Sequence, residues 1–238
     1  MTAGHASDEL RDDLVTANRI LFHFGIVDGY GHISARNDAD PSTFVMARYV
    51  APGLVTNDDL RLFSLDSIAL RDGERHYSER FIHGEIYKAR ADVMSVIHCH
   101  AAPLIPFGVT KTPLRPVYHM SAFLGAGVPV FEIRETAGMT DMLIRTPELG
   151  AALARTLGDR PMALMRGHGA TFVGDSIKQV VYRSIYGAQN AVSQMEALRL
   201  GEVTYLEPEE AALMQTHSHG TLNRPWEIWK QQALGRSS

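Results

Sequence analysis

The sequence VMSVIHCH at residues 93–100 decides the fold prediction, because a run of β-forming apolar residues ends there in two histidines. Residues two apart on a strand point to the same face, so His98 and His100 can bind one ion while Cys99 turns away. Neutral imidazole is a good ligand for zinc, manganese or iron. The stretch therefore predicts a strand that carries two ligands of a metal site and buries Cys99.

A third histidine, His168, lies between Gly167 and Gly169, directly after another short apolar run at residues 163–165. Glycine lets the backbone turn sharply and lets a second chain segment approach closely. A histidine pair at this spacing is more often incidental than metal-binding, and a metal needs a further ligand from elsewhere in the chain. We therefore expect His168 to complete a three-histidine site.

An acidic residue, Glu79, follows Ser78, which we expect to cap a helix that carries His83. Glu79 and His83 are four residues apart, so they would share one face of that helix. A carboxylate beside a histidine-bound metal could complete the coordination shell or transfer protons. The alternative is a solvated glutamate that the helix dipole stabilises. We interpret His83 as a structural residue or a hydrogen-bond partner of a ligand, and these residues alone do not name a reaction.

Helices at both ends of the chain and strands in its middle predict an α/β layered fold. Ser7 caps the first helix and Gly25 ends it, Thr146 with Pro147 begins another, and the longest helix covers residues 176–199. Strands are expected from residue 33, and at residues 43–48, 62–65, 93–97, 128–133, 163–165 and 170–173.

The domain organisation is expected to be simple, since no internal repeat, linker or low-complexity segment interrupts the chain. One domain should cover residues 1–238, with a helical extension at the C-terminal side from about residue 205. In that extension Trp226 and Trp229 are three residues apart and share a helix face. We expect this face to dock the helix onto the body of the protein or onto a neighbouring subunit.

Composition limits the classes of function. Of the 238 residues, 45% are hydrophobic, and the formal net charge of −4 gives no reason to expect nucleic acid or an anionic membrane as a partner. A single cysteine rules out an intrachain disulfide, and no apolar run approaches the length of a membrane span. The N-terminal residues do not form a secretory signal, so we expect a cytoplasmic protein.

Four stretches, in this order, resemble the class II aldolase/adducin family. They are GHISAR at residues 31–36, Ser78-Glu79 with His83, VIHCHA at residues 96–101, and RGHGA at residues 166–170. The resemblance implies a three-layer α/β/α domain with a central, mostly antiparallel sheet. It also implies a cyclic homotetramer with active sites at subunit interfaces. In such a site the metal ligands would be His98, His100 and His168, and Glu79 would be an acid/base that also approaches the metal.

Departures from the family pattern indicate a branch. Sugar-phosphate aldolases of the family bind phosphate through an asparagine, a Thr-Gly loop and a Ser-Ser pair. The corresponding places here look like His32, residues 51–53 and Tyr77-Ser78, so phosphate donors are lost. The chain is more similar to the decarboxylase branch, which acts on hydroxylated aromatic or pyridine carboxylates and related ring-cleavage products. The similar stretches are residues 51–56, 79–84, 115–120 and 224–230.

The expected function is that of a metal-dependent carbon–carbon lyase. It would decarboxylate a hydroxylated aromatic carboxylate, or a ring-cleavage product, through a metal-stabilised enolate, with Glu79 delivering or removing the proton. The cofactor would be a divalent metal ion, zinc first, with manganese, magnesium or iron as alternatives. One alternative function is a class II aldolase for a non-phosphorylated hydroxy-keto acid or sugar. Another is a non-catalytic adducin-like interaction module, although such a module has no use for a chelating cluster.

The substrate would be a small carboxylate, and arginine pairs well with both carboxylate oxygens. Tyrosine and histidine side chains beside the motifs are candidates for proton donors in the same pocket. The candidate substrate-binding residues are His32, Ser34, Arg36, Arg48, Ser78, Arg115, Tyr118 and His119.

Overall fold

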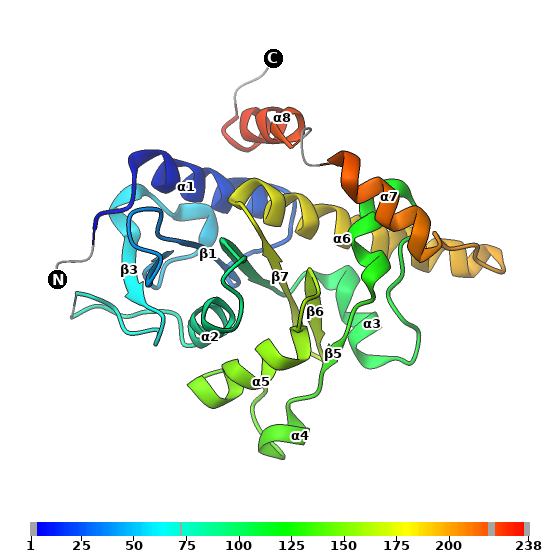
Figure 1. The fold of residues 1–238 in the computed structure, drawn as a ribbon, viewed down its shortest axis with the longest axis horizontal. Coiled ribbons are helices and arrows are strands. Elements are labelled where there is room, and N and C mark those ends of the chain that lie inside the picture. Colours follow the sequence, from blue (N-terminus) through cyan, green and yellow to red (C-terminus); the bar gives the residue numbers. More distant parts are fainter. Residues whose placement is uncertain (1–3, 72, 219–221, 236–238) are drawn as a thin grey trace.

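A twisted mixed sheet forms the centre of the computed structural model, which describes residues 4–71, 73–218 and 222–235 (Figure 1). Among these residues the sheet has seven strands in the order β3-β2-β1-β4-β7-β6-β5. All neighbouring strands pair antiparallel except β5 and β6, which are parallel, so the prediction of a mostly antiparallel sheet is confirmed. The strands are β1 (His32–Arg36), β2 (Thr43–Ala47), β3 (Leu60–Ser64), β4 (Ser95–Cys99), β5 (Val130–Phe131), β6 (Met162–Met165) and β7 (Gly169–Gly174).

Helices cover both faces of the sheet (Figure 1). On one face α1 and α6 lie together, with α8 packed outside them, and on the other face α2 packs against α5. This arrangement confirms the predicted three-layer α/β/α fold. The helices are α1 (Asp8–His23), α2 (Phe81–Ala89), α3 (Ile105–Val109), α4 (Arg134–Ala137), α5 (Pro147–Leu157), α6 (Ile177–Leu200), α7 (Pro208–Ser218) and α8 (Asn223–Ala233). Short 3₁₀ turns are η1 (Pro52–Leu54), η2 (Asn57–Asp59), η3 (Ala102–Leu104) and η4 (His119–Ala126).

The predicted helix starts are confirmed by side-chain caps. The Ser7 hydroxyl accepts a hydrogen bond from the Leu10 amide at 3.1 Å, and Thr146 caps α5 in the same way. At the start of α6 the Ser176 hydroxyl accepts from the Gln179 amide at 3.2 Å. Each cap satisfies an amide that has no partner inside its helix.

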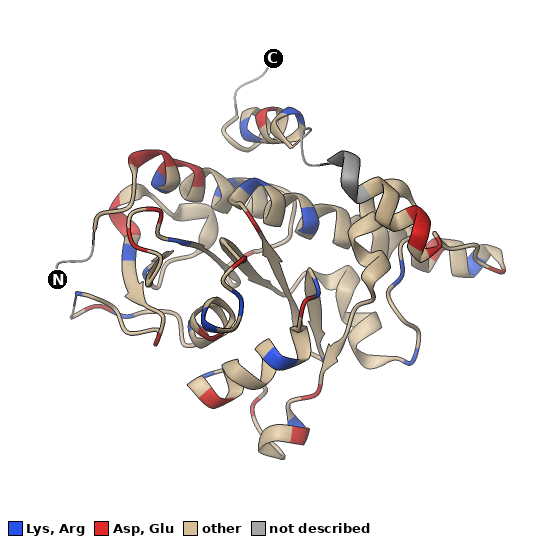
Figure 2. Ribbon diagram, in the orientation of Figure 1, with Lys and Arg blue, Asp and Glu red and all other residues tan. Residues whose placement is uncertain are grey.

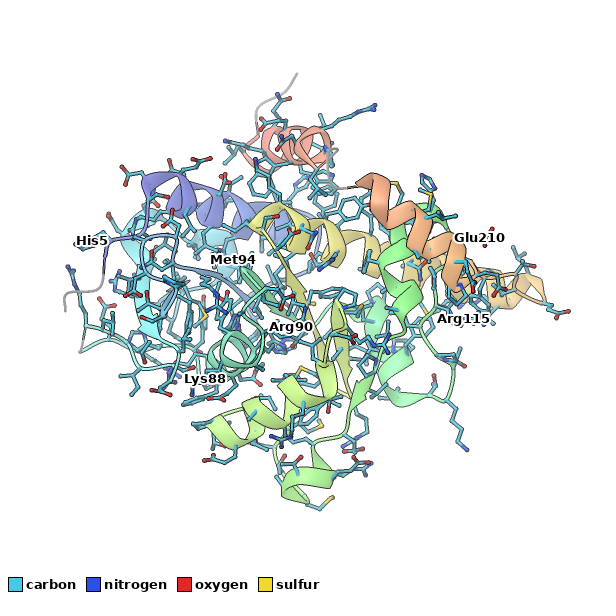
Figure 3. The ribbon with its side chains drawn as sticks, in the orientation of Figure 1. His5, Lys88, Arg90, Met94, Arg115 and Glu210 are labelled. Atoms are coloured by element: carbon cyan, nitrogen blue, oxygen red, sulfur yellow. The ribbon has the colours of Figure 1, made fainter. Side chains whose placement is uncertain are left out.

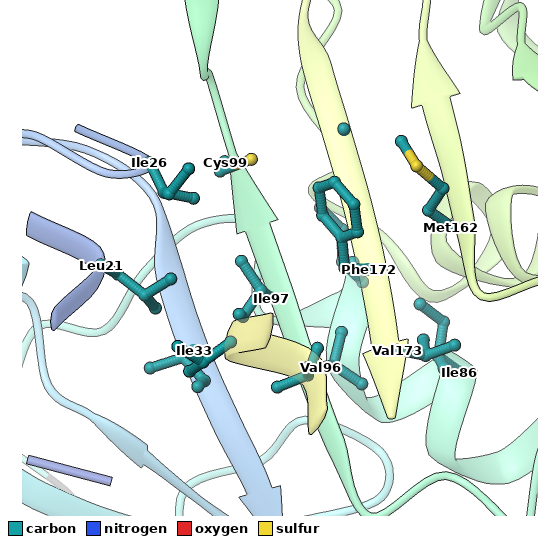
Figure 4. Packing of buried hydrophobic residues seen from close by; sticks show 14 of the residues in the cluster. Leu21, Ile26, Ile33, Ile86, Val96, Ile97, Cys99, Met162, Phe172 and Val173 are labelled. Atoms are coloured by element: carbon teal, nitrogen blue, oxygen red, sulfur yellow. The ribbon is translucent and has the colours of Figure 1, made fainter. Parts of the chain in front are cut away.

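The two faces of β4 have different roles. Val96 and His98 face the side covered by α2, because the His98 ring lies near His32, which contacts His83 of α2. Ile97 and Cys99 point to the opposite face (Figure 4). Cys99 is fully buried there, so the prediction that it turns away from the histidines is confirmed.

Two predicted boundaries are wrong. The strand expected at residues 128–133 is reduced to Val130–Phe131, because the chain turns into α4 immediately afterwards. The helix expected to begin after Ser78 begins at Phe81, and Ser78 is exposed and caps nothing. Glu79 therefore lies in a turn before α2 and does not share a helix face with His83. The reason is tertiary, since its carboxylate is held by the Ile144 amide from a distant loop.

The C-terminal helix α8 docks onto the body of the protein as predicted. The Trp229 ring lies 5.6 Å from Phe24 of α1 and 5.9 Å from Tyr186 of α6, and Trp226 is also buried. Figure 2 shows that acidic and basic residues are interspersed along the helices in this view. No helix in the described part of the chain is long and apolar enough to cross a membrane.

Candidate metal centre

Four side chains from three distant segments meet at one point. His98 is on β4, His100 follows that strand, His168 lies in the turn between β6 and β7, and Glu79 precedes α2. One ligand atom from each residue lies within 4.8 Å of the others. The predicted three-histidine cluster and its acidic neighbour are therefore together in space.

The distances in the cluster fit a metal ion. The Nε2 atom of His100 lies 3.1 Å from the Nε2 atoms of both His98 and His168. Two imidazole nitrogens bound to one zinc ion at a tetrahedral angle are about 3.4 Å apart, and a smaller angle brings them closer. One Glu79 oxygen lies 3.6 Å from His98 and 3.5 Å from His168. Three nitrogens and one carboxylate oxygen form a donor set that suits a divalent ion.

Glycine makes this convergence possible. Gly167 has φ of +63°, a conformation that side chains disfavour, and it directs the chain back toward β4. At Gly169 an added Cβ would lie 2.1 Å from the Cys99 carbonyl oxygen. Only glycine lets β7 begin so close to the end of β4, and this approach sets His168 beside His100.

Glu79 is buried and ionised. Burial by itself would raise the pKa of its carboxyl, but attraction to His98 and hydrogen bonding with His168 hold that pKa well below its usual range. Its other oxygen accepts a hydrogen bond from the Ile144 amide at 2.9 Å. A metal ion in the cluster would favour the carboxylate further. Glu79 is thus available as a ligand or as a base.

His98 is fully buried, whereas His100 and His168 are partly buried. Burial, together with the neighbouring His98 and His168, lowers the pKa of His100 to about 4. A neutral imidazole has a lone pair free for a metal at neutral pH. The ring of Tyr30 lies 6.5 Å from the His100 ring and is largely exposed.

Two predicted substrate-binding residues, His32 and Ser34, lie behind the cluster on β1. The His32 ring is 5.2 Å from the His98 ring, and its Nδ1 atom is 2.6 Å from the Nε2 atom of His83. The Ser34 hydroxyl contacts His83 and the Tyr87 hydroxyl, each at 2.7 Å. These contacts agree with the interpretation of His83 as a buried structural or supporting histidine.

Arg36, a candidate for substrate binding, is hydrogen-bonded to the backbone. Its guanidinium donates hydrogen bonds to the carbonyls of Val93, Pro41, Tyr87 and Arg90. These bonds use four of the five N–H donors of the guanidinium. The residue therefore ties β1 to the end of α2 and leaves no fork for a carboxylate.

The remaining candidates lie in other contacts. Arg48 pairs with Asp59 at 2.7 Å, and Ser78 is exposed beside Glu79. Arg115 stacks on Tyr205 at 4.0 Å, away from the central strands (Figure 3). Tyr118 is half-buried near Tyr186, and His119 is exposed. The contacts of Arg115, Tyr118 and His119 described here include no residue of the cluster, so the part of these three residues in substrate binding stays a prediction.

Sequence reasoning did not identify three tyrosines as neighbours of the cluster or of His32, although the family resemblance had placed Tyr77 where a phosphate donor stands. Tyr77 packs against His32 with ring centroids 4.9 Å apart, Tyr30 lies beside His100, and Tyr87 ends the chain of contacts from His32. Tyr87 could have been found by spacing, because it follows His83 by one helical turn and shares its face. Tyr30 and Tyr77 lie in turns, where no periodicity identifies their neighbours.

The structure defines a mixed α/β domain in which a histidine and glutamate cluster at the end of the central strands could hold a metal ion. Residues 12–195 match the family model described as class II aldolase and adducin N-terminal domain. The chain belongs to this family, and the resemblance inferred from the four stretches is confirmed.

Relatives with assigned names include decarboxylases. The chain is 35% identical to decarboxylase tropJ of Talaromyces stipitatus, with 92% of this chain and 91% of that protein covered. It is 32% identical to 3,4-dihydroxyphthalate decarboxylase of Arthrobacter keyseri, with 74% and 73% covered. Among solved structures, L-fuculose 1-phosphate aldolase from Glaciozyma antarctica has a TM-score of 0.79 at 20% identity, over 99% of this chain and 94% of that one. This last likeness shows the fold alone.

Proposed function

We propose that this protein is a metal-dependent lyase that decarboxylates a hydroxylated aromatic carboxylate. The observation that carries the proposal is the cluster itself, in which a buried glutamate lies within 3.6 Å of two imidazole nitrogens. His98, His100 and His168 would hold the metal, with Glu79 as a fourth ligand or as the base beside it. When bound, a divalent ion supplies Lewis acidity that stabilises negative charge on a substrate oxygen.

Glu79 is placed to move the proton. As a carboxylate it accepts the proton of the substrate hydroxyl, which raises the electron density of the ring. It then gives that proton to the ring carbon that carries the carboxylate. The carbon–carbon bond breaks, CO₂ leaves, and the electron pair of that bond returns to the ring. A proton from solvent restores the hydroxyl, so one proton is consumed for each CO₂ released.

The surroundings of the cluster favour an aromatic substrate over a sugar phosphate. Tyr30 offers a largely exposed ring 6.5 Å from the His100 ring, and the buried rings of Tyr77 and His32 pack behind His98. Aromatic rings stack favourably on such side chains. His32 and Tyr77 also stand where the family resemblance places phosphate donors. The names of the relatives, decarboxylases in two of the matches above, support the same choice.

The test is a panel of hydroxyaromatic carboxylates and hydroxy-keto acids, incubated with protein loaded with zinc, manganese, magnesium or iron. CO₂ and carbonyl products are measured in the same samples. CO₂ release that a chelator abolishes and one added metal restores is the expected result, and it identifies both the metal and the ring of the substrate. Carbonyl products without CO₂ would replace the proposal by an aldolase for a non-phosphorylated substrate.

A third outcome would indicate a non-catalytic protein. No metal retained after dialysis, and no product from any substrate, would favour a non-catalytic interaction module of the adducin type. The retained cluster argues against that outcome, because four converging ligand groups have no role in a protein-binding surface.

We propose further that residues 1–238 form one domain and that the protein assembles as a homotetramer whose neighbouring subunits complete each site. Support comes from the family resemblance and from one continuous cluster of buried hydrophobic residues that extends from Ala6 to Trp229. Light scattering measures the assembly directly. A monomer with full activity would refute the shared site.

A further inference from the structure

A buried chain of four polar side chains, which we call the relay, lies behind the metal cluster. It consists of Tyr87, Ser34, His83 and His32, which are at most 5% exposed. The Tyr87 and Ser34 oxygens are 2.7 Å apart, and the Ser34 oxygen is 2.7 Å from Nδ1 of His83. The Nε2 atom of His83 is 2.6 Å from Nδ1 of His32. Three short contacts therefore connect the four groups in a single line.

Each group in the relay has one proton to share. A buried charge without a partner is costly, so both imidazoles are neutral and the phenol keeps its proton. Burial also lowers the pKa of His83 to about 3 and raises that of Tyr87. Four protons and three contacts leave one proton that is not used inside the relay. Its position depends on the direction in which the hydrogen bonds run.

In one direction Tyr87 donates to Ser34, Ser34 donates to Nδ1 of His83, and the Nε2–H of His83 donates to His32. The unused proton is then on Nε2 of His32. In the reverse direction it is the phenol proton of Tyr87. In the described part of the chain, the acceptor within reach of that phenol is the Ser34 hydroxyl. The Val96 amide also contacts the phenol, but it is a donor and cannot accept the proton. A buried hydroxyl proton without an acceptor loses its hydration and gains nothing. His32 is the more exposed end of the relay, at 5% against 1% for Tyr87, so the first direction is favoured.

We propose that the relay holds His32 in its Nε2–H tautomer, as a hydrogen-bond donor to an anionic oxygen of the bound substrate. The His32 ring lies between the rings of Tyr77 and His98, at 4.9 Å and 5.2 Å, so this donor is next to a metal ligand. A preorganised donor beside a site of developing negative charge stabilises that charge. Ser34, His83 and Tyr87 are positioning residues that act through His32. The hydrogen bond from His32 to the substrate rests on the proposed function, whereas the tautomer of His32 does not.

The tautomer can be read by ¹⁵N NMR of the zinc-loaded full-length protein labelled at histidine, because protonated and unprotonated ring nitrogens have distinct shifts. The signals of His32 and His83 are assigned with His32→Asn and His83→Asn variants. The expected result is a proton on Nε2 and none on Nδ1 in both rings. Protons on Nδ1 of both rings would show that the hydrogen bonds run in the reverse direction. That result would overturn the proposal, whatever effect substitutions at Ser34 have.

Substitutions at Ser34 test whether the relay is the cause. Ser34→Ala should give His32 a mixture of tautomers and lower kcat for CO₂ release roughly tenfold, while Ser34→Thr, which keeps the hydroxyl, should restore both. Ser95→Ala is the matched control, since Ser95 is equally buried on the next strand and donates to the Ser34 carbonyl without joining the relay. Unchanged tautomers in Ser34→Ala would refute the proposal. Correct tautomers without CO₂ from any substrate would refute the proposed function and leave the relay standing.

Discussion

The Nε2 atom of His168 lies 3.1 Å from the Nε2 atom of His100, although the two residues are 68 positions apart in the chain. The contact exists because β7 begins where β4 ends, with Cys99 opposite Ala170 in the pairing of the two strands. His98 reaches the same point from within β4. The three nitrogens therefore come from residues in a strand or directly beside a strand end. Rigid elements rather than long loops hold these side chains in place.

Binding of a metal at this point should stabilise the fold. We expect zinc at 100 times its dissociation constant to stabilise the protein by about 2.7 kcal/mol, because the ligands are assembled only in the folded state. Thermal unfolding with and without chelator measures the effect. His98→Ala should lose the metal-induced increase in melting temperature. His5→Ala, at an exposed position, should keep it, and an equal increase in both variants would place the ion elsewhere.

Replacement of Glu79 should separate metal binding from turnover. Glu79→Gln keeps the shape of the side chain and can still accept from the Ile144 amide, but it cannot take up a proton. We expect bound metal within twofold of wild type and activity lower by roughly 10²–10⁴. Elemental analysis and the CO₂ assay on the same sample give both numbers. Glu148→Gln, the same change at an exposed position, is the control. Full activity in Glu79→Gln would exclude Glu79 as the base.

The approach of β7 to β4 should depend on Gly169. An added methyl group would lie 2.1 Å from the Cys99 carbonyl oxygen, so Gly169→Ala must push the two strands apart at the cluster. We expect a loss of stability of about 2 kcal/mol or more, with weaker metal binding. Urea unfolding and metal titration measure the two effects. Gly29→Ala is the control, because nothing lies within 4 Å of its added methyl group. Equal stabilities of the two variants would contradict the prediction.

The stability of the loop that carries Asp59 should depend on pH. Burial would raise the pKa of Asp59, but hydrogen bonds from the Thr56 hydroxyl and amide, together with Arg48, hold it below its usual range. A lowered pKa in the folded state stabilises the protein above the unfolded value of 3.8, and this contribution is lost as the pH falls through the folded pKa.

Asp59→Asn should therefore be less stable than wild type by about 1 kcal/mol at pH 7, with the difference closing below about pH 4. Urea unfolding at pH 7, 5 and 3 follows the difference. Asp58→Asn, next to it and exposed, should show little difference at any pH. A difference for Asp59→Asn that stays constant from pH 7 to pH 3 would show that the charge of the carboxylate is not its cause.

Local pattern was enough to predict that the three histidines converge. Strand alternation placed His98 and His100 on one face, and the glycines around His168 indicated a turn with a close approach, as the φ of +63° at Gly167 confirms. The caps at Ser7 and Thr146 were equally predictable. In each case the signal is geometric and lies within a few residues, where the period of a strand or the hydrogen-bond needs of a helix end leave little choice.

Only the tertiary structure decided how the other residues are used. Glu79 lies in a turn before α2, although the sequence around it predicted a helix start. Its carboxylate accepts a hydrogen bond from the Ile144 amide, which is 65 residues away. Arg36 became a structural residue because four carbonyls at the end of α2 and beside β1 take its donors. Buried polar groups need hydrogen-bond partners. Here those partners come from segments that are distant in sequence, so periodicity along the chain does not predict them.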